Sequence, residues 1–238
     1  ECDQDGKLHT NVINSLMQEV SNSHIKDSNF SAKNIYSQGI LWILNRVSAR
    51  FQKHPKWRDE VRIYTWQSGM DRLGFFRDYY MFDSDGQAYG AARSFWTIAS
   101  ADTHKLLSPS TIFSDGENPM LSTLHALPYP PTRLRRNFAD FTDAKSYDKV
   151  IGYSEIDRNG HMNNTRYVAL CRDAAALFHP EGYVSSLDIN YVEEVFQEEI
   201  LHTEACILEE TATYTDIAVH ALRAGNKESF RAILRFQK

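Results

Sequence analysis

Residues 156–174 read IDRNGHMNNTRYVALCRDA, and residues 2–20 read CDQDGKLHTNVINSLMQEV. Both stretches contain Asp-x-(Asp or Asn)-Gly, and aligning Asp3 with Asp157 gives an offset of 157 − 3 = 154 residues. In both copies the motif precedes a segment whose apolar residues recur at helical spacing. Self-similarity at a long interval is the signature of a duplicated structural unit. The sequence therefore predicts two copies of one fold.

Each half is expected to begin with a long helix and to continue as strands. The apolar stripes of the two predicted helices are Val12, Leu16 and Val20, and Tyr167, Cys171, Ala174 and Phe178. Strand-like segments follow, with turns predicted at Ser-Asp-Gly (84–86) and Gly-Asn (225–226). One helix can bury its apolar face against one side of an antiparallel sheet. We therefore expect two α+β domains, each a long helix followed by an antiparallel meander.

A proline-rich stretch separates the two halves. Five of the seven prolines lie in residues 109–131. Proline suits neither a helix interior nor a central strand, so this stretch is expected to be irregular. An irregular connection of this length joins domains or has a task of its own. We place the first domain at residues 1–105, the linker at 106–146 and the second domain at 147–238.

Composition limits the classes of function. The formal net charge is −5, which gives no general attraction to nucleic acid, although a local basic patch is compatible with it. No apolar run approaches the roughly 18 residues of a membrane span, and no signal-like N-terminus is recognised. Three cysteines are too few for a disulfide framework and fit a reducing compartment. We expect a cytoplasmic protein that binds neither nucleic acid nor membrane.

The polar residues at 157–164 have two interpretations. Asn-Gly favours a turn, and Asn163 or Asn164 could cap a helix that begins near Thr165. Taken alone, the residues favour this structural interpretation. The alternative is a cluster that performs chemistry, for which the comparison of the two copies speaks: the second has His161 where the first has Lys7. A titratable histidine in only one copy suggests a single site in the second domain.

A helix start offers a physical reason for such a site. The first amides of a helix lack intrahelical acceptors and carry the positive end of its dipole. Amides near Asn163, Asn164 and Thr165 could therefore stabilise an oxyanion formed from a thioester or ester carbonyl. His179 and His202 stand alone, without the spacing of metal ligands, so no metal site is expected. We expect no other cofactor.

Three segments carry a resemblance to a known family: DRNGHMNNTRYV (157–168), SSLDINYVEEV (185–195) and ILWILNRVSARFQKHPKWRDEVRIYTWQSG (40–69). Together they resemble the acyl-acyl carrier protein (acyl-ACP) thioesterases of plants and bacteria, most closely the bacterial type. The resemblance covers nearly the whole chain. It implies two tandem hot-dog domains, each with a sheet wrapped around a long helix. It also implies that the protein hydrolyses fatty acyl-ACP to free fatty acid and holo-ACP, which ends fatty acid synthesis.

The resemblance also assigns catalytic residues. The Asp-x-Asn-x-His motif of the family falls on Asp157, Asn159 and His161, and the family's glutamate falls on Glu194, since 194 − 161 = 33. Glu194 is then the general base and Asn159 positions the attacking water. His161, oriented by Asp157, polarises the thioester or protonates the leaving thiolate.

The residues around Glu194 leave two points open. Strict alternation along a strand sends Glu193, not Glu194, to the face of Leu187 and Ile189. A β-bulge could re-aim the pair, and Glu193 stays the fallback. The family often has a cysteine after its glutamate, but this chain has Val195. A cysteine nucleophile would then have to be Cys171 or Cys206, which lie in apolar patterns typical of buried structural thiols.

The resemblance places the acyl tunnel largely in the first domain. The candidate acyl-binding residues are Ile13, Leu16, Met17, Trp42, Trp66 and Trp96. For each of them, plain core packing is the alternative. The carrier protein is acidic and its arm carries a phosphate, so a local basic patch is needed. The densest basic cluster is Arg133, Arg135 and Arg136, for which an ordinary solvated surface is the alternative.

Other classes of function share parts of this pattern. A hot-dog enzyme acting on coenzyme A thioesters would use the same chemistry, whereas related dehydratases use a different histidine motif that is not found here. A non-catalytic acyl-binding module would keep the tunnel without needing Glu194. Because hot-dog domains pair and this chain has two of them, both a monomer and a homodimer are expected to be feasible.

Overall fold

The computed structural model describes residues 1–28, 30–113, 122–135 and 142–238. The first half contributes, in order, α1 (Thr10–Ile25), α2 (Ala32–Ser37), β1 (Ile40–Phe51), β2 (Arg62–Met70), β3 (Phe75–Phe82), β4 (Ala88–Ser100), β5 (Leu106–Leu107) and the 3-10 turn η1 (Pro109–Thr111). The second half contributes β6 (Lys145–Val150), the 3-10 turn η3 (Tyr153–Glu155), α3 (Asn164–Ala176), β7 (Tyr183–Tyr191), β8 (Ile200–Glu210), β9 (Tyr214–Arg223) and β10 (Lys227–Gln237).

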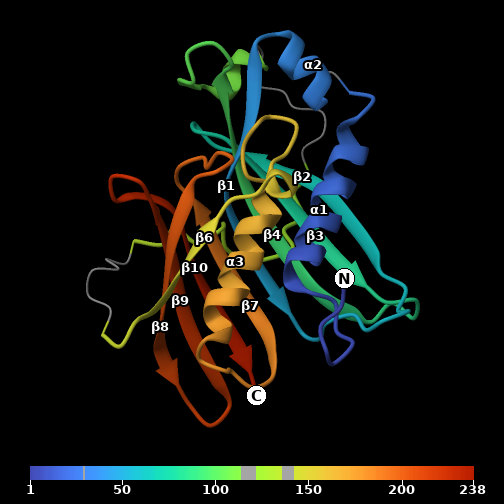
Figure 1. Cartoon of the computed structure of the whole chain (residues 1–238). Helices are drawn as coiled ribbons and strands as arrows, with labels where there is room; N and C mark the ends of the chain where they lie inside the picture. The colour runs from blue at the N-terminus through green and yellow to red at the C-terminus, as the bar shows by residue number, and fades with distance from the viewer. Residues whose placement is uncertain (29, 114–121, 136–141) are drawn as a thin grey trace.

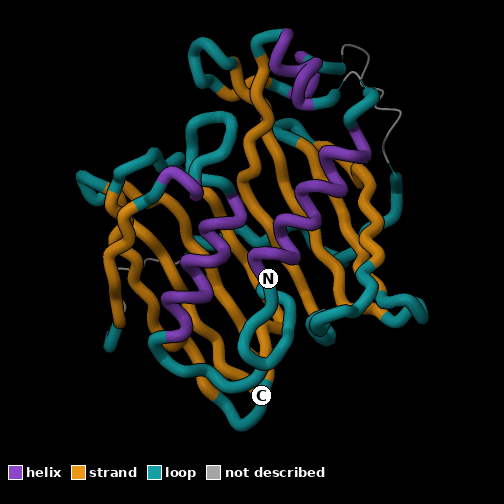
Figure 2. The backbone as a smooth tube through the Cα atoms, turned by 45° about the vertical axis from the view of Figure 1, so that its right-hand side comes forward, coloured by secondary structure: helices purple, strands orange, loops and turns teal. Residues whose placement is uncertain are grey.

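All of these strands belong to one antiparallel sheet that both halves share. Its order is β2-β3-β4-β1-β7-β10-β9-β8-β6, with β5 beside β4. The seam between the halves is the pairing of β1 with β7, from Arg46 opposite Asn190 to Arg50 opposite Ser186. The helices α1 and α3 lie side by side on one face of this sheet (Figures 1 and 2). The predicted α+β class, with one long helix in each half, is confirmed.

The two halves repeat the same strand order, which differs from a simple meander. Apart from the short β5 and the edge strand β6, each half has four strands, of which the first pairs with the fourth, β1 with β4 and β7 with β10, while the second, third and fourth form a meander. The connection that leaves the first strand must therefore cross the end of the sheet: residues 52–61 in the first half and 192–199 in the second. The two predicted hairpin turns are confirmed, between β3 and β4 and between β9 and β10.

The buried faces of the two long helices differ in how well the sequence predicts them. In the predicted stripe of the second helix, Tyr167, Cys171 and Ala174 are buried, and Phe178 lies past the end of α3 and is half-buried. In α1 the predicted stripe is wrong: Leu16 is 36% exposed, and the buried side chains are Thr10, Ile13, Asn14, Met17 and Ser21. The physical reason is that polar side chains occupy the buried face. The Ser21 hydroxyl, for example, is hydrogen-bonded to the Tyr79 hydroxyl at 2.9 Å and to the Met17 carbonyl at 2.8 Å.

Residues 122–135 of the linker lie on the face of the sheet opposite the helices. Buried or half-buried side chains of that face bind its backbone: the Ala126 N–H donates to Asp78 (2.7 Å), the Thr132 N–H to Ser48 (2.9 Å) and the Leu134 N–H to Asn190 (2.9 Å). Residues 122–135 therefore have almost no regular structure, as the prolines predict, but they are fixed in place. This anchoring satisfies linker amides that would otherwise be buried without partners.

Candidate active site

The turn before α3 is built by the Asp-x-Asn-Gly motif. The Asp157 N–H donates to the His161 carbonyl at 2.9 Å, and the Gly160 N–H donates to the Asp157 carbonyl at 3.0 Å. Gly160 has φ of +81°, a conformation that favours glycine. Asn163 then caps α3, because its side-chain oxygen accepts the Thr165 N–H at 2.9 Å. The predicted turn and cap are both confirmed.

His161 leaves this turn toward the connection between β7 and β8. Its Nδ1 lies 3.2 Å from Oε1 of Glu194, and the two side chains are 22% and 47% exposed. The ring of Phe196 stands edge-on to the imidazole, with the ring centroids 5.0 Å apart and the planes at 87°. The structure thus brings a histidine and a carboxylate from distant parts of the sequence together beside a helix start, partly open to solvent.

An irregularity at the end of β7 decides which glutamate reaches His161. Regular pairing stops at Tyr191, and the next two amides, of Val192 and Glu193, both donate to the Ser229 carbonyl at 2.8 and 3.1 Å. Two consecutive donors on one acceptor break the alternation of the strand, as in a β-bulge. Glu194 consequently turns to His161, while the Glu193 carboxylate lies 3.7 Å from Arg223.

Val195 anchors the loop that carries Glu194. Its side chain is fully buried, and its carbonyl accepts the Met162 N–H at 2.8 Å, which joins the loop to the turn before α3. The position that follows the glutamate therefore points into the core. Cys171 and Cys206 are buried, and burial raises the pKa of Cys171 well above its usual range. These positions do not provide a reactive thiolate.

The geometry corrects the expectation for Asp157. One of its carboxylate oxygens accepts the Asn159 N–H at 2.7 Å, and the contacts of the His161 ring within the described residues are to Glu194 and Phe196. Asp157 therefore acts on His161 through the backbone of the turn, not by holding the imidazole. The side chain of Asn159 is exposed at the tip of the turn.

The amides at the helix start are not equally available. The Asn163 N–H donates to the Glu155 carbonyl at 2.9 Å, and the Thr165 N–H is taken by the Asn163 side chain. Of the three predicted donors, Asn164 is the one whose N–H has no acceptor among the described residues. A developing oxyanion would therefore be met by Asn164, at the positive end of the α3 dipole.

The six predicted acyl-binding residues fall in different places. Ile13, Met17 and Trp96 lie in or against the core between α1 and the sheet. Leu16 is exposed, and Trp42 packs in a separate cluster beside α2 with Phe75 and Ile98.

The acyl-binding prediction for Trp66 is corrected, because this residue lies on the opposite face of the sheet from α1. It stands opposite Asp78 in the pairing of β2 with β3, and both side chains bond the linker: the Trp66 indole donates to the Leu124 carbonyl at 2.8 Å, and Asp78 accepts the Ala126 N–H. The next residue, Tyr79, faces α1 instead. An acyl chain held between α1 and the sheet would not reach Trp66.

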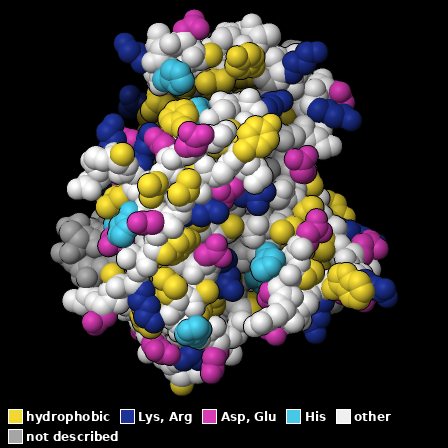
Figure 3. Space-filling view, viewed as in Figure 1, with side chains coloured by type: hydrophobic (Ala, Val, Ile, Leu, Met, Phe, Trp, Pro, Cys, Tyr) yellow, Lys and Arg dark blue, Asp and Glu magenta, His cyan; other side chains and the backbone are white. Residues whose placement is uncertain are grey.

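The predicted basic cluster lies on the linker. Arg133 and Arg135 are exposed, and Arg136 lies outside the described residues. Figure 3 shows acidic and basic side chains interspersed over the face that carries α1 and α3. The two described arginines are on the other side of the sheet, next to the anchored residues Thr132 and Leu134.

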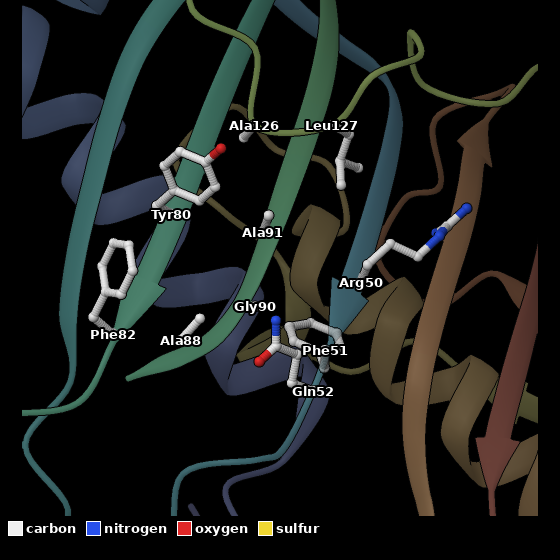
Figure 4. A pocket seen from close by; sticks show the side chains of 10 residues that line it. All are labelled: Arg50, Phe51, Gln52, Tyr80, Phe82, Ala88, Gly90, Ala91, Ala126 and Leu127. Carbon is white, nitrogen blue, oxygen red and sulfur yellow. The ribbon is translucent and has the colours of Figure 1, made fainter. Parts of the chain in front are cut away.

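A hollow of about 310 Å³ also lies on the linker side of the sheet. Figure 4 shows Tyr80 and Phe82 of β3 and Ala88 and Ala91 of β4 facing the linker residue Leu127 across it. Its apolar lining includes none of the residues predicted for catalysis or acyl binding. This hollow is therefore distinct from the His161–Glu194 site.

Sequence reasoning missed two residues of the site, Phe196 and Arg223. Phe196 directly follows the Glu-Glu-Val segment, and its proximity to Glu194 in the sequence was a usable signal. Arg223 ends β9, and its guanidinium donates to the Glu194 carbonyl at 2.6 Å. Nothing in the pattern of β9 indicates this contact, because it depends on how the connection 192–199 crosses the sheet.

Two further observations concern the described ranges as a whole. No group of three or more His, Cys, Asp or Glu side chains in them is arranged to hold a metal ion. Within the same ranges, no helix combines the length and the apolar character that a membrane crossing requires.

Known proteins with a similar sequence or structure can now be compared with this geometry. A palmitoyl-acyl carrier protein thioesterase of Arabidopsis thaliana, a chloroplast protein, is 24% identical over 241 residues, which cover 93% of this chain and 57% of the Arabidopsis protein. The chain thus spans about half the length of the curated relatives it matches.

Solved structures share the fold. An acyl-ACP thioesterase from Bacteroides thetaiotaomicron superposes with a TM-score of 0.81 at 20% identity, over 99% of this chain and 92% of the other. The 12:0-ACP thioesterase from Umbellularia californica gives 0.84 at 18% identity, over 100% and 90%. The fold is thus two tandem hot-dog domains.

Family models agree with this assignment over most of the sequence. Residues 1–110 match the acyl-ACP thioesterase N-terminal domain, and residues 141–238 match the acyl-ACP thioesterase C-terminal domain. The two matches cover both halves of the chain and both of its long helices. The chain belongs to the acyl-ACP thioesterase family.

Proposed function

We propose that the protein hydrolyses the thioester of a fatty acyl chain on acyl carrier protein, releasing a free fatty acid and holo-ACP. The observation that carries this proposal is the approach of His161 to Glu194, 3.2 Å apart beside the start of α3. A base, an imidazole and an available helix-start amide are the groups that thioester hydrolysis requires. Family membership supports the substrate class.

In the proposed mechanism, Glu194 removes a proton from a water molecule that Asn159 helps to position. The hydroxide attacks the thioester carbonyl carbon, and the oxygen of the tetrahedral intermediate is stabilised by the Asn164 N–H. When the C–S bond breaks, His161 gives a proton to the thiolate of the carrier's arm. Because Nδ1 faces Glu194, Nε2 is the nitrogen left for the substrate. As Nε2 gives its proton to the thiolate, Nδ1 takes the proton that Glu194 gained, across the 3.2 Å contact, so that Glu194 is again a carboxylate and the imidazole stays neutral.

The proposed division of labour follows the two copies. The second domain, residues 147–238, carries the catalytic pair, and the first, residues 1–105, binds the acyl chain. Ile13, Met17 and Trp96 are the residues we retain for that role, since they line the space between α1 and the sheet. Residues 106–146 join the domains. The matches of the two family models, at 1–110 and 141–238, support these boundaries.

For the carrier protein we propose Arg133 and Arg135 as a docking site. Both are exposed on an anchored segment, so their positions do not depend on a loose linker. Reversing both charges to glutamate is expected to raise KM for acyl-ACP, most strongly at low salt, and to leave kcat unchanged. An unchanged KM at low salt would make these arginines ordinary surface.

A content of three cysteines is in keeping with a cytoplasmic enzyme. Because His161 and Glu194 come from the same chain, either a monomer or a homodimer would have a complete catalytic pair in each chain. The decisive test of function is release of free thiol from acyl-ACP and from acyl-CoA, measured side by side. Faster turnover of acyl-ACP is expected. Preference for acyl-CoA would assign a coenzyme A thioesterase. Binding without turnover of either substrate would assign an acyl-binding module.

A further inference from the structure

The β9–β10 hairpin holds the loop that carries Glu194. Arg223, the last residue of β9, is largely buried, with 18% of its side chain exposed. Its Nη1 donates to the Glu194 carbonyl at 2.6 Å, and its Nη2 is paired with the Glu199 carboxylate. The same guanidinium lies over the ring of Phe196, 5.5 Å from its centroid. One side chain thus contacts Glu194, Phe196 and Glu199, which are the two ends and the middle of residues 194–199 (the 194–199 loop).

Glu199 extends this hold to the residue beside the imidazole. Its second carboxylate oxygen accepts the Phe196 N–H at 3.1 Å, and its carbonyl accepts the Ile151 N–H at 2.9 Å. Phe196 in turn packs edge-on against His161. Arg223 is therefore connected to both members of the candidate catalytic pair, to Glu194 through its carbonyl and to His161 through Glu199 and Phe196.

The loop backbone is fixed on either side of Glu194, at Glu193 by the Ser229 carbonyl and at Val195 by the Met162 N–H, and the Arg223 bond to the Glu194 carbonyl is the fixed point between them. Beyond Tyr191 the chain leaves the sheet, and the Glu194 side chain is 47% exposed, so packing alone does not hold that carboxylate. The Arg223 contact is to the carbonyl of Glu194, not to its carboxylate. This leaves the carboxylate unpaired by Arg223 while fixing the backbone from which it projects. A fork of donors suits this task better than a single ammonium.

We propose that Arg223 is a positioning residue for the thioesterase reaction, which holds the 194–199 loop so that the Glu194 carboxylate stays at His161. The inference rests on the proposed function, since it assigns Glu194 the role of base. A displacement of about 1 Å in a catalytic group can cost about 10²-fold in rate. Loss of Arg223 should therefore lower kcat, with little effect on substrate binding.

The test compares Arg223→Met with Arg235→Met. Arg235 is a matched control on the same pair of strands: it is bonded to Asp216 through two nitrogens, at 2.6 and 2.7 Å, and has no contact with the loop. Arg223→Met is expected to lower kcat on acyl-ACP about 10²-fold with KM unchanged, and Arg223→Lys to restore part of it. Arg235→Met should keep wild-type kcat. Equal kcat in the two methionine variants would overturn the proposal.

A double-mutant cycle with Glu194→Gln separates this inference from the proposed function. If Arg223 acts through Glu194, adding Arg223→Met to Glu194→Gln should lower kcat little further. If the double variant instead shows the product of the two single losses in kcat, the positioning role would be contradicted. Wild-type turnover of Glu194→Gln would refute the proposed function itself. The last test is the pH–rate profile of Arg223→Met. If its acid limb moves while the plateau value of kcat is unchanged, Arg223 acts on the site through its charge, which would overturn the positioning role.

Discussion

The turns that precede α1 and α3 share their main hydrogen bonds, and the Asp3 carboxylate accepts one more, from the Lys7 N–H at 2.8 Å. The Asp3 N–H donates to the Lys7 carbonyl at 2.8 Å, as the Asp157 N–H donates to that of His161 at 2.9 Å. The Asp3 side chain accepts the Asp5 N–H, as Asp157 accepts that of Asn159. The bridges between Cys2 and Leu8 and between Ile156 and Met162 also correspond, since 156 − 2 = 154 and 162 − 8 = 154.

What the copies do not share is what surrounds the turn. In the first, Lys7 forms a bridge with Lys56, and His9 precedes α1 without a side-chain cap. In the second, His161 meets Glu194 and Asn163 caps α3. An aspartate that does the same work in both copies is a structural part of the turn. The duplicated turn is therefore a scaffold, and in the proposed mechanism the chemistry depends on the histidine and on the connection that faces it.

The largest effect is expected when the second turn is given the residue that the first turn has at the corresponding position. His161→Lys is expected to lower kcat/KM for acyl-ACP about 10²–10⁴-fold, because a lysine cannot replace the imidazole in proton transfer. The partly exposed position should tolerate the change, so the thermal midpoint should stay close to wild type. Steady-state thiol release and a melting curve measure both quantities.

The reciprocal variant is the control for this change. Lys7→His places a histidine in the first turn, where among the described residues Lys7 is paired with Asp5 of the same turn, at 3.7 Å, and not with a carboxylate from a crossing loop. This variant should add no activity to either wild type or His161→Lys. Activity regained in the double variant would contradict the assignment of a single site to the second domain.

The glycines of the two turns should behave alike in stability and differently in activity. Gly6 and Gly160 have φ of +73° and +81°, and a Cβ at either would meet open space. Alanine at either should therefore lower the free energy of unfolding by about 1–2 kcal/mol, through backbone strain alone. Only Gly160→Ala should also lower kcat, since that turn presents His161. Urea unfolding and thiol release test this pair, and a loss of activity in Gly6→Ala would remove the distinction.

The caps give a smaller difference. Asn163→Ala removes the acceptor of the Thr165 N–H and should cost about 1 kcal/mol of stability, whereas His9→Ala should cost much less because His9 makes no capping bond. Chemical denaturation measures both. Equal costs would mean that the cap of α3 adds nothing that the start of α1 lacks.

The smallest effect concerns β6, which precedes the second turn and has no counterpart before the first in the described residues. Asp148 on β6 accepts a hydrogen bond from His202 on β8 at 2.7 Å, and this bond raises the pKa of His202. The pair therefore stabilises the fold below the unfolded-state pKa of histidine and loses that effect as pH rises through the folded-state pKa. Asp148→Asn should lower the melting temperature at pH 5 slightly and leave it unchanged at pH 9. An equal loss at both pH values would contradict the linkage.

Much of this molecule could be predicted from its sequence because duplication repeats local signals. The Asp-x-(Asp or Asn)-Gly turns, the Asn163 cap and the buried face of α3 all depend on residues close in sequence, and all are confirmed. The face of α1 was wrong because Asn14 and Ser21 are buried polar residues that an apolar pattern omits. The pairing of β1 with β4 and of β7 with β10 was missed for a different reason: strand order depends on connections that cross the sheet.

In the candidate site, too, local features could be predicted from the sequence and long-range contacts could not. The motif and the resemblance together led to His161 and Glu194, but alternation along β7 favoured Glu193, because a pattern of period two cannot register where a strand ends. Arg223 could not be predicted, since its contact joins two segments whose only link is the tertiary fold. Trp66 was misplaced because an aromatic residue suits either face of a sheet, and only the linker's course shows which face it occupies.

The central claim is that the loop glutamate beside His161 is the base, and the neighbouring glutamates provide their own test. Glu194→Gln and Glu193→Gln make the same chemical change one residue apart, on exposed side chains of which only Glu194 lies at the imidazole. We predict that kcat for acyl-ACP falls about 10²–10⁴-fold in Glu194→Gln and stays near wild type in Glu193→Gln. Wild-type turnover by a folded Glu194→Gln, or a larger loss in Glu193→Gln, would contradict the account.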